Sequence, residues 1–277
     1  LHGAEELETK NFAHNSLEYI NTIAEIESRV YADRATHLGD PDFFNVPQKS
    51  LLDKDYLLNR FSKINNNIKT PSSEIKEGSF NGIESEETTH FSIVDKYGNA
   101  VSVTTTINGG YGSKVVVQGA GFLLNNEMDD FSVKPGYPNM FGLVGGEANS
   151  IEPNKRMLSS MTPTIIEKDN NLFMVLGTPG GSTIITSVFQ TILNVIDFGM
   201  GMQEAVDSKK FHHQWLPDVL VVEENTLSDK LSNNLTQIGH NIVKRTSIGR
   251  MDCILVNEDG SLEGGADKRG DNIALGY

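Results

Sequence analysis

The sequence predicts an α+β protein in which antiparallel sheets are layered with helices. Three segments have the pattern of β-hairpins, since two β-type runs flank a short polar turn in each of them: residues 90–107, 162–177 and 252–266. Helical patterns lie between the hairpins and do not alternate with single strands. There is no repeat at a solenoid period. Hairpins kept apart from helices favour an α+β arrangement over a parallel α/β one.

Five segments show the apolar spacing of helices. The first, residues 14–31, has apolar side chains three and four residues apart, with Asn15 or Ser16 as its cap. The other four are residues 53–64, 182–198, 203–209 and 228–238. Residues 65–87 are rich in Asn, Ser, Glu and Gly and poor in large apolar side chains, which predicts a flexible linker.

Composition excludes several classes of protein. The formal net charge of −14 argues against nucleic acid and anionic membranes as partners, because both need clustered Lys and Arg. No apolar run reaches eighteen residues, so no membrane-spanning helix is expected, and the first ten residues do not have the pattern of a secretory signal. A signal could have been removed or could lie upstream. The one cysteine, Cys253, excludes an internal disulfide and is expected in a buried strand.

The junction Glu86-Glu87-Thr88-Thr89-His90 carries the most chemical information. A strand begins there with a hydroxyl residue directly after the predicted linker. If the chain is cut before Thr88, the freed α-amino group becomes a base beside the hydroxyl, with a reference pKa of about 8. Taken alone, the junction is also compatible with an ordinary Thr-rich strand, since Thr is common in strands.

Several motifs, in order along the chain, extend this interpretation. They are TTHFSIVDKYGNAVSVTTTIN, LLNNEMDDFSVKPG, GLVGG, PNKRMLSSMTPTI, GTPGGS, FHHQWLPD and the final Gly-Tyr, and YADRATHLGDPDF precedes them. Together they closely resemble the γ-glutamyltransferase family. By this resemblance, residues 88–277 correspond to the family's nucleophile-bearing small subunit, and residues 1–87 correspond to the end of its large subunit, closing in a flexible linker. With the missing upstream region the two would form one structural domain.

The resemblance implies a fold and a nucleophile. The fold would be the four-layer α-β-β-α sandwich of the N-terminal-nucleophile hydrolases. The precursor would cut itself between Glu87 and Thr88, and Thr88 would then attack the γ-carbonyl of a glutamyl donor. Thr106 matches the threonine whose hydroxyl orients the nucleophile. Gly180 and Gly181 match the family's oxyanion hole, and N–H groups before a helix suit a developing negative charge.

The same resemblance implies how an amino-acid donor is held. Asp130 would bind the α-ammonium, helped by Glu127 and Asn108. The attraction between two carboxylates and one cation is electrostatically favourable. Ser159 and Ser160 would donate to the α-carboxylate.

One expected partner of that carboxylate has no match in this chain. The family's carboxylate-binding Arg belongs to a large-subunit segment upstream of this chain, and Arg34, Arg60 and Arg156 do not stand in its context. Residues 135–146 match a lid loop rich in Pro and Gly, in which Phe141 stands where bacterial members often have Tyr.

No cofactor and no metal are expected. His212 and His213 are adjacent, so their side chains point in different directions, and no HExxH-type spacing occurs. His90 is expected as a packed strand residue, with a role supporting the site as the alternative, and Trp215 as the anchor of a loop.

The resulting functional hypothesis is a γ-glutamyl hydrolase and transferase without nucleic-acid or membrane partners. Its partners would be a glutathione-type donor, water or an amine acceptor, and the remaining large-subunit segment. The alternatives are a related autoprocessed amidohydrolase, such as a cephalosporin acylase or a polyglutamate-processing enzyme, and an unprocessed inactive fragment. By the same resemblance, a periplasmic or secreted location is expected.

Overall fold

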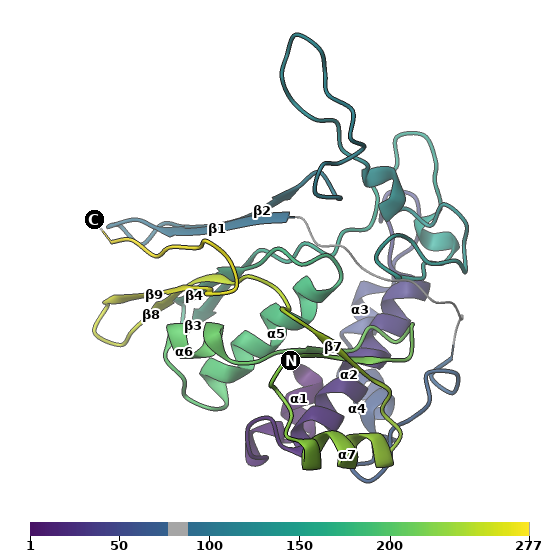
Figure 1. Ribbon diagram of the computed structural model, residues 1–277, viewed down its shortest axis with the longest axis vertical. Coiled ribbons are helices and arrows are strands. Elements are labelled where there is room, and N and C mark those ends of the chain that lie inside the picture. The colour runs from purple at the N-terminus through teal and green to yellow at the C-terminus, as the bar shows by residue number, and fades with distance from the viewer. Residues whose placement is uncertain (77–87, 277) are drawn as a thin grey trace. The chain divides into compact units, whose positions relative to one another are not determined.

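A computed structural model describes residues 1–76 and 88–276 of the chain (Figure 1). These residues form two compact units, each assembled from three segments that are separate in the sequence. Among the described residues, unit 1 contains residues 1–76, 127–159 and 211–246, and unit 2 contains residues 88–126, 160–210 and 247–276. Glu87 lies outside the described residues, so the predicted cut before Thr88 stays a prediction.

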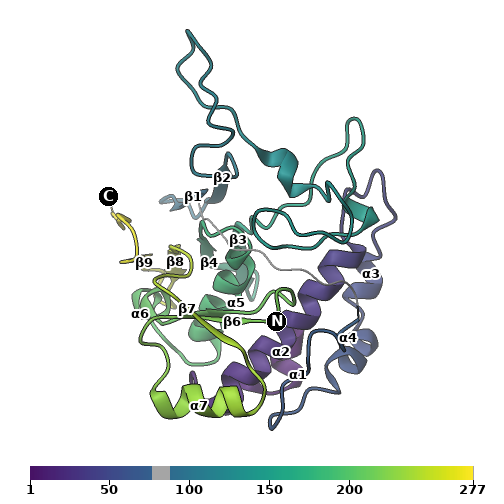
Figure 2. The ribbon, with the colours of Figure 1, turned by 45° about the vertical axis from the view of Figure 1, so that its right-hand side comes forward.

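Unit 1 is built around one long helix, α2 (Leu17–His37), the long purple helix of Figures 1 and 2. The Ser16 side chain caps it by accepting a hydrogen bond from the Tyr19 N–H, as the sequence predicted. The helix continues six residues past the predicted end at position 31, because Ala, Arg and other helix-compatible residues follow until Leu38 leaves the helical region. Its interior includes charged groups that pair with each other, notably Arg29 and Glu25 at 2.7 Å.

Shorter elements surround α2 in the same unit. The other helices are α1 (His2–Glu6), α3 (Gln48–Leu51), α4 (Lys54–Phe61) and α7 (Asp229–Gln237), with 3₁₀ turns η1 (Thr9–Asn11), η2 (Glu127–Asp130) and η3 (Glu147–Asn149). Strands β5 (Phe211–His212), β6 (Leu220–Glu223) and β7 (Ile242–Arg245) make a three-stranded sheet in that order. The sequence did not predict this sheet, because strands of two to four residues are too short to show a regular alternation.

Residues 65–76 are not the flexible linker that their composition predicts. Lys69 and Ser72 are buried, and the Lys69 ammonium pairs with Asp218 at 2.5 Å. The Ser72 N–H donates to the same carboxylate, and the indole N–H of Trp215 donates to the Ser72 carbonyl. Polar residues therefore pack here because an acid and an indole from a distant segment satisfy them, which composition cannot reveal. The prediction that Trp215 anchors a loop is confirmed.

Unit 2 is layered, with helices on one sheet and a second sheet beyond it. Strands β3 (Thr164–Lys168), β4 (Asn171–Gly177), β8 (Asp252–Val256) and β9 (Leu262–Ala266) form one sheet in the order β3-β4-β8-β9. Helices α5 (Thr183–Ile196) and α6 (Met202–Asp207) cover one face of it, and β1 (Thr88–Val94) with β2 (Ala100–Thr106) lies over the other (Figure 1). The three predicted hairpins are confirmed with their turns.

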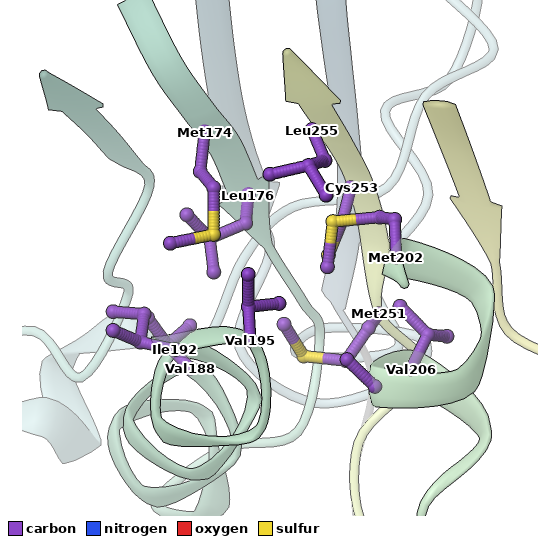
Figure 3. Close-up of a cluster of buried hydrophobic side chains, with 11 residues drawn as sticks. Met174, Leu176, Val188, Ile192, Val195, Met202, Val206, Met251, Cys253 and Leu255 are labelled. Atoms are coloured by element: carbon purple, nitrogen blue, oxygen red, sulfur yellow. The ribbon is translucent and has the colours of Figure 1, made fainter. Parts of the chain in front are cut away.

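The helix-facing side of this sheet holds the core of unit 2 (Figure 3). Its members come from β4, β8, α5, α6 and the residue just before β8: Met174, Leu176, Val188, Ile192, Val195, Met202, Ala205, Val206, Met251, Cys253 and Leu255. Cys253 is buried in a strand, as predicted, and burial raises the pKa of its thiol. The core fixes the position of the sheet against which the β1–β2 hairpin packs. No helix in the described ranges combines the length and hydropathy needed to cross a bilayer.

His90 joins the two sheets of unit 2. Its Nδ1 atom is hydrogen-bonded to the Thr104 hydroxyl at 2.8 Å, and its Nε2 atom is hydrogen-bonded to the Ser92 hydroxyl at 3.1 Å. The ring lies against Gly177, where an added Cβ would come within 2.2 Å of it. The packed-strand interpretation of His90 is thereby confirmed, and β4 needs glycine at this position because any side chain would displace the ring.

Burial of His90 predicts an acid-sensitive fold. Burial lowers the pKa of the imidazole from 6.5 to about 4. Because the unfolded chain binds the proton between pH 6.5 and 4 while the folded chain does not, stability is full above pH 6.5 and falls as the pH drops towards 4. Between pH 6.5 and 4, we expect His90→Gln to lose less free energy of unfolding than the wild type. The difference should be on the order of 2 kcal/mol after allowance for solvent screening.

Urea unfolding of the whole protein between pH 4 and 7 measures the effect. The exposed His2, changed to Gln, is the matched control and should leave the slope of stability against pH unchanged. An unchanged slope in His90→Gln would contradict the prediction.

Candidate active site

The β1–β2 hairpin brings two hydroxyl groups together in unit 2. Thr88 and Thr106 are directly opposite each other in the antiparallel register, and both side chains are half-buried. The Thr88 hydroxyl donates to the Thr106 hydroxyl at 3.3 Å, longer than the roughly 2.7–2.8 Å common for such bonds. The Thr106 oxygen also accepts the Asn108 N–H at 2.9 Å. The pairing of Thr88 with Thr106 is therefore present in the hairpin itself.

Asn108 is positioned by its backbone. Its φ of 71° is in the left-handed region, which Asn tolerates better than most residues. Its side-chain amide donates to the Asn126 carbonyl at 3.2 Å, and the residue is buried. Asn108 thus closes the loop that follows β2 and presents its own N–H to Thr106.

The Gly180–Gly181 pair leads into α5 in the same unit. Both residues have positive φ, 146° and 54°, which side chains rarely allow. The Gly180 carbonyl is occupied, because it accepts the Thr183 hydroxyl at 2.7 Å. Within residues 1–76 and 88–276, no acceptor pairs with the N–H groups of the two glycines. Their N–H groups therefore remain available to an oxyanion at the start of the helix.

A cavity of about 320 Å³ in unit 2 is lined by Thr88 and by Pro179, which precedes the glycine pair. Its wall also includes Arg250 and Asp252, two charged residues that the sequence analysis did not single out. Burial raises the pKa of Asp252 to about 6, although Asn272 donates to the carboxylate at 2.8 Å. No motif marked these residues, because the cavity that they line with Thr88 and Pro179 forms only when segments distant in the sequence meet in the folded unit.

The predicted ammonium-binding acids lie in unit 1, on the turn η2. Burial, followed by the neighbouring charge of Glu127, raises the pKa of Asp130 to about 7, and the charge of Arg34 opposes this rise. Burial also raises the pKa of Glu127. Such perturbed carboxylates are typical of functional sites. The turn is held by Asn149, whose side-chain amide donates to the Asp130 carbonyl at 2.8 Å.

Asn149 also holds the segment that carries the predicted carboxylate-binding serines. Its side-chain oxygen accepts the Leu158 N–H at 3.0 Å, one residue before Ser159. Ser159 belongs to unit 1 and Ser160 to unit 2, so the pair spans the division between the units. Asn149 was missed by the sequence analysis, since an Asn in a loop shows its two-sided bonding only in the structure.

Phe141, in the predicted lid loop, is buried within unit 1. The Asn139 side chain accepts the N–H groups of Phe141 and Leu143, and Gln214 donates to the Phe141 carbonyl at 3.0 Å. The loop is therefore closed on itself by hydrogen bonds, and its role as a hinged lid stays a prediction.

The two adjacent histidines take separate partners in unit 1. His212 bonds the Gln214 side chain at 2.8 Å, while His213 lies 3.3 Å from Asp218. Burial lowers the pKa of both rings. Across the described ranges, no three His, Cys, Asp or Glu side chains are grouped so as to hold a metal ion.

The layers of unit 2, together with a hydroxyl at the first residue of a strand and a glycine pair at a helix start, define the class of N-terminal-nucleophile hydrolases. Residues 1–277 match the family model of gamma-glutamyltranspeptidase, and the chain belongs to that family.

Relatives with curated names are similar along almost the whole chain. The glutathione hydrolase proenzyme of Escherichia coli (strain K12) is 46% identical over 274 residues, which are 99% of this chain and 47% of that protein. The glutathione hydrolase proenzyme of Pseudomonas aeruginosa (strain PAO1) is 48% identical over 94% of this chain and 46% of its own length. The chain therefore spans about half the length of these relatives.

Solved structures support the fold. Gamma-glutamyltranspeptidase of Helicobacter pylori is 54% identical with a TM-score of 0.64, over 66% of this chain and 100% of the compared chain. Cephalosporin acylase of Bacillus halodurans, at 22% identity, has a TM-score of 0.78 over 100% of this chain and 49% of its own, a likeness of fold alone. The predicted α+β fold of the N-terminal-nucleophile hydrolase type is confirmed.

Proposed function

We propose that this chain is the nucleophile-bearing part of a γ-glutamyl hydrolase and transferase that is activated by its own cleavage before Thr88. The observation that carries the proposal is the Thr88–Thr106 hydroxyl pair at the start of β1, in a chain that belongs to the gamma-glutamyltranspeptidase family. The names of the relatives, glutathione hydrolase proenzymes, support both the donor class and the processing step.

The proposed reaction proceeds through an acyl-enzyme. The Thr88 oxygen attacks the γ-carbonyl carbon while its proton passes to the freed α-amino group of Thr88. The resulting oxyanion is stabilised by the Gly180 and Gly181 N–H groups. The C–N bond then breaks, and the leaving amine takes the proton. Water or an amine next attacks the acyl carbon, and Thr88 regains its proton as the glutamyl group leaves.

The proposed partners follow from this reaction. The donor is glutathione or another γ-glutamyl amide, and the acceptor is water, an amino acid or a peptide. The α-ammonium of the donor would be bound by Asp130, and its α-carboxylate by Ser159 and Ser160. A bidentate Arg for that carboxylate would come from the remaining large-subunit segment.

A second candidate function is that of an acylase for donors without an ammonium group. It is favoured by the likeness to Acylase ACY 1 proenzyme of Pseudomonas sp. (strain SE83), which is 33% identical over 94% of this chain and 44% of that protein. The acidic turn η2 favours the first candidate, because its two carboxylates attract a donor ammonium and would gain nothing from an acyl group that lacks one.

Two chromogenic donors distinguish the candidates. The whole proenzyme, including the upstream segment, is assayed with γ-L-glutamyl-p-nitroanilide and with glutaryl-p-nitroanilide, which lacks only the ammonium. We expect kcat/KM to be ~10–100-fold higher for the glutamyl donor, the value of one charge-assisted contact. Asp130→Asn should narrow that preference. Equal rates for both donors would instead support the acylase function. If the proenzyme cleaved neither donor, both candidate functions would be contradicted.

A further inference from the structure

Arg34 and Asp130 line one small cavity in unit 1. Arg34 lies in the last turn of α2, and Asp130 ends the turn η2. The cavity has a volume of about 20 Å³, enough for one group of the size of water or ammonium. Its wall also includes Tyr137, Asn139 and Asn149. Arg34 from helix α2 therefore lines the same small cavity as the acid that is proposed to bind the donor.

The backbone around the cavity is tied to the end of α2. The Gly146 N–H donates to the Ala35 carbonyl at 2.8 Å, next to Arg34 in the helix. Asn149, three residues later, holds the Asp130 carbonyl through its side chain. Hydrogen bonds from the segment 146–149 thus hold both the end of α2 and the turn η2 within one unit. The fold therefore sets the spacing between Arg34 and Asp130.

Arg34, outside the turn η2, is a cation whose charge lowers the pKa of Asp130. Glu127 and Asp129, on the same turn, add like charge. Tyr137, from the following loop, is the other titratable side chain in the cavity wall, and the Lys134 ammonium lies over its ring at 3.4 Å. An opposite charge commonly lowers the pKa of a carboxyl by about 1–3.

We propose that Arg34 is a positioning residue that keeps Asp130 ionised, so that the enzyme binds the ammonium of its donor at neutral pH. The inference rests on the proposed function. Arg34 acts through Asp130 and does not grip the donor carboxylate. Its charge has two opposed effects, since it favours the carboxylate but repels an approaching ammonium. Near neutrality the first effect dominates, because the pKa of Asp130, about 7 with Arg34 in place, would rise further without it. At alkaline pH only the repulsion remains.

The test is Arg34→Gln in the whole proenzyme, assayed for KM and kcat from pH 6 to 9 with γ-L-glutamyl-p-nitroanilide. If the pKa of Asp130 rises by about 1–2, its ionised fraction at pH 7 falls from about half to about 1–10%. We therefore expect KM to rise ~5–50-fold at pH 7 while kcat changes little. The KM ratio should fall towards one or below by pH 9, and Arg34→Lys should restore KM at pH 7.

Three controls distinguish this positioning role from a structural role and from direct binding of the donor carboxylate. Arg60→Gln removes a charge from the neighbouring helix α4, where Arg60 pairs with Asp33 at 2.9 Å, and should leave the pH profile of KM unchanged. In an Asp130→Asn background, Arg34→Gln should not raise KM further, because only the repulsion between Arg34 and the donor ammonium is left to be removed. With the glutaryl donor, which has no ammonium, Arg34→Gln should change KM by less than twofold.

Other outcomes would overturn the proposal. A KM ratio equal at every pH indicates a structural role, and an equal loss with the glutaryl donor indicates that Arg34 grips the carboxylate. Calorimetric binding of L-glutamate at the same pH values needs no turnover. If the wild type cleaves no anilide but binds glutamate with the expected Arg34 dependence, the proposed function fails and this inference stands. If binding is unaffected by Arg34→Gln at pH 7, the inference fails.

Discussion

Thr88→Ala is expected to abolish both the cut at the Glu87–Thr88 bond and the release of p-nitroaniline from a γ-glutamyl donor. The change removes the only hydroxyl that could act as nucleophile in both reactions under the proposal, while a small residue remains at the first position of β1. A loss of ~10⁴-fold or more in turnover follows from the deletion of a nucleophile. The whole proenzyme should run as one band of full length on a denaturing gel, whereas the wild type should give two.

Two variants make the test specific. Thr88→Ser keeps a hydroxyl and should retain measurable cleavage and turnover. Thr105→Ala removes an exposed hydroxyl beside Thr106, on the opposite side of β2, and should process and turn over normally. Cleavage of Thr88→Ala at the wild-type rate would contradict the assignment of Thr88 as the nucleophile. If the wild type is fully processed but does not cleave the anilide, the fold assignment holds and the substrate is another amide.

Gly181→Ala is expected to lower kcat by ~10²–10³-fold with a much smaller change in KM. The φ of Gly181 is 54°, so a Cβ there costs about 1–2 kcal/mol of strain. Relief of that strain turns the backbone and moves the N–H groups that precede α5. An oxyanion forms only as the reaction proceeds, so the loss falls on kcat. Steady-state kinetics of the processed enzyme measure the change.

Gly199→Ala is the matched control for backbone strain. Gly199 has a φ of 65°, and nothing in the structure lies within 4 Å of an added Cβ, so the variant has a similar strain without a change at the proposed oxyanion hole. Its loss of stability should resemble that of Gly181→Ala, and its kcat should equal that of the wild type. If both variants lose kcat equally, the glycine pair acts through stability and not through the oxyanion.

Local pattern was enough to predict the elements that carry the proposed chemistry. The alternation of Thr88 to Thr106 around a polar turn predicted the β1–β2 hairpin, and antiparallel pairing then places the first and last residues of such a hairpin opposite each other. The Ser16 cap of α2 and the strand position of Cys253 were equally readable, because caps and strand alternation depend on neighbours in the chain.

Residues 65–76 are held by tertiary contacts that their local composition does not predict. Their polar sequence predicts a linker, but the buried residues Lys69 and Ser72 are hydrogen-bonded to Asp218 and Trp215, more than 140 residues away in the chain. The short strands β5, β6 and β7 were missed for a related reason. A strand of two to four residues depends on its partners in the sheet, and those partners come from separate segments.

By itself the sequence determined the type and order of the reactive groups, including Thr88, the glycine pair and the acids of η2. Only the tertiary structure decided their environments. Asp130 has a pKa near 7 because burial and Glu127 oppose its charge while Arg34 favours it. Asn149 joins two loops because both come within reach of one amide. Helix caps and hairpin turns depend on near neighbours in the chain, whereas burial and charge pairing depend on contacts between distant segments that form only when the chain folds.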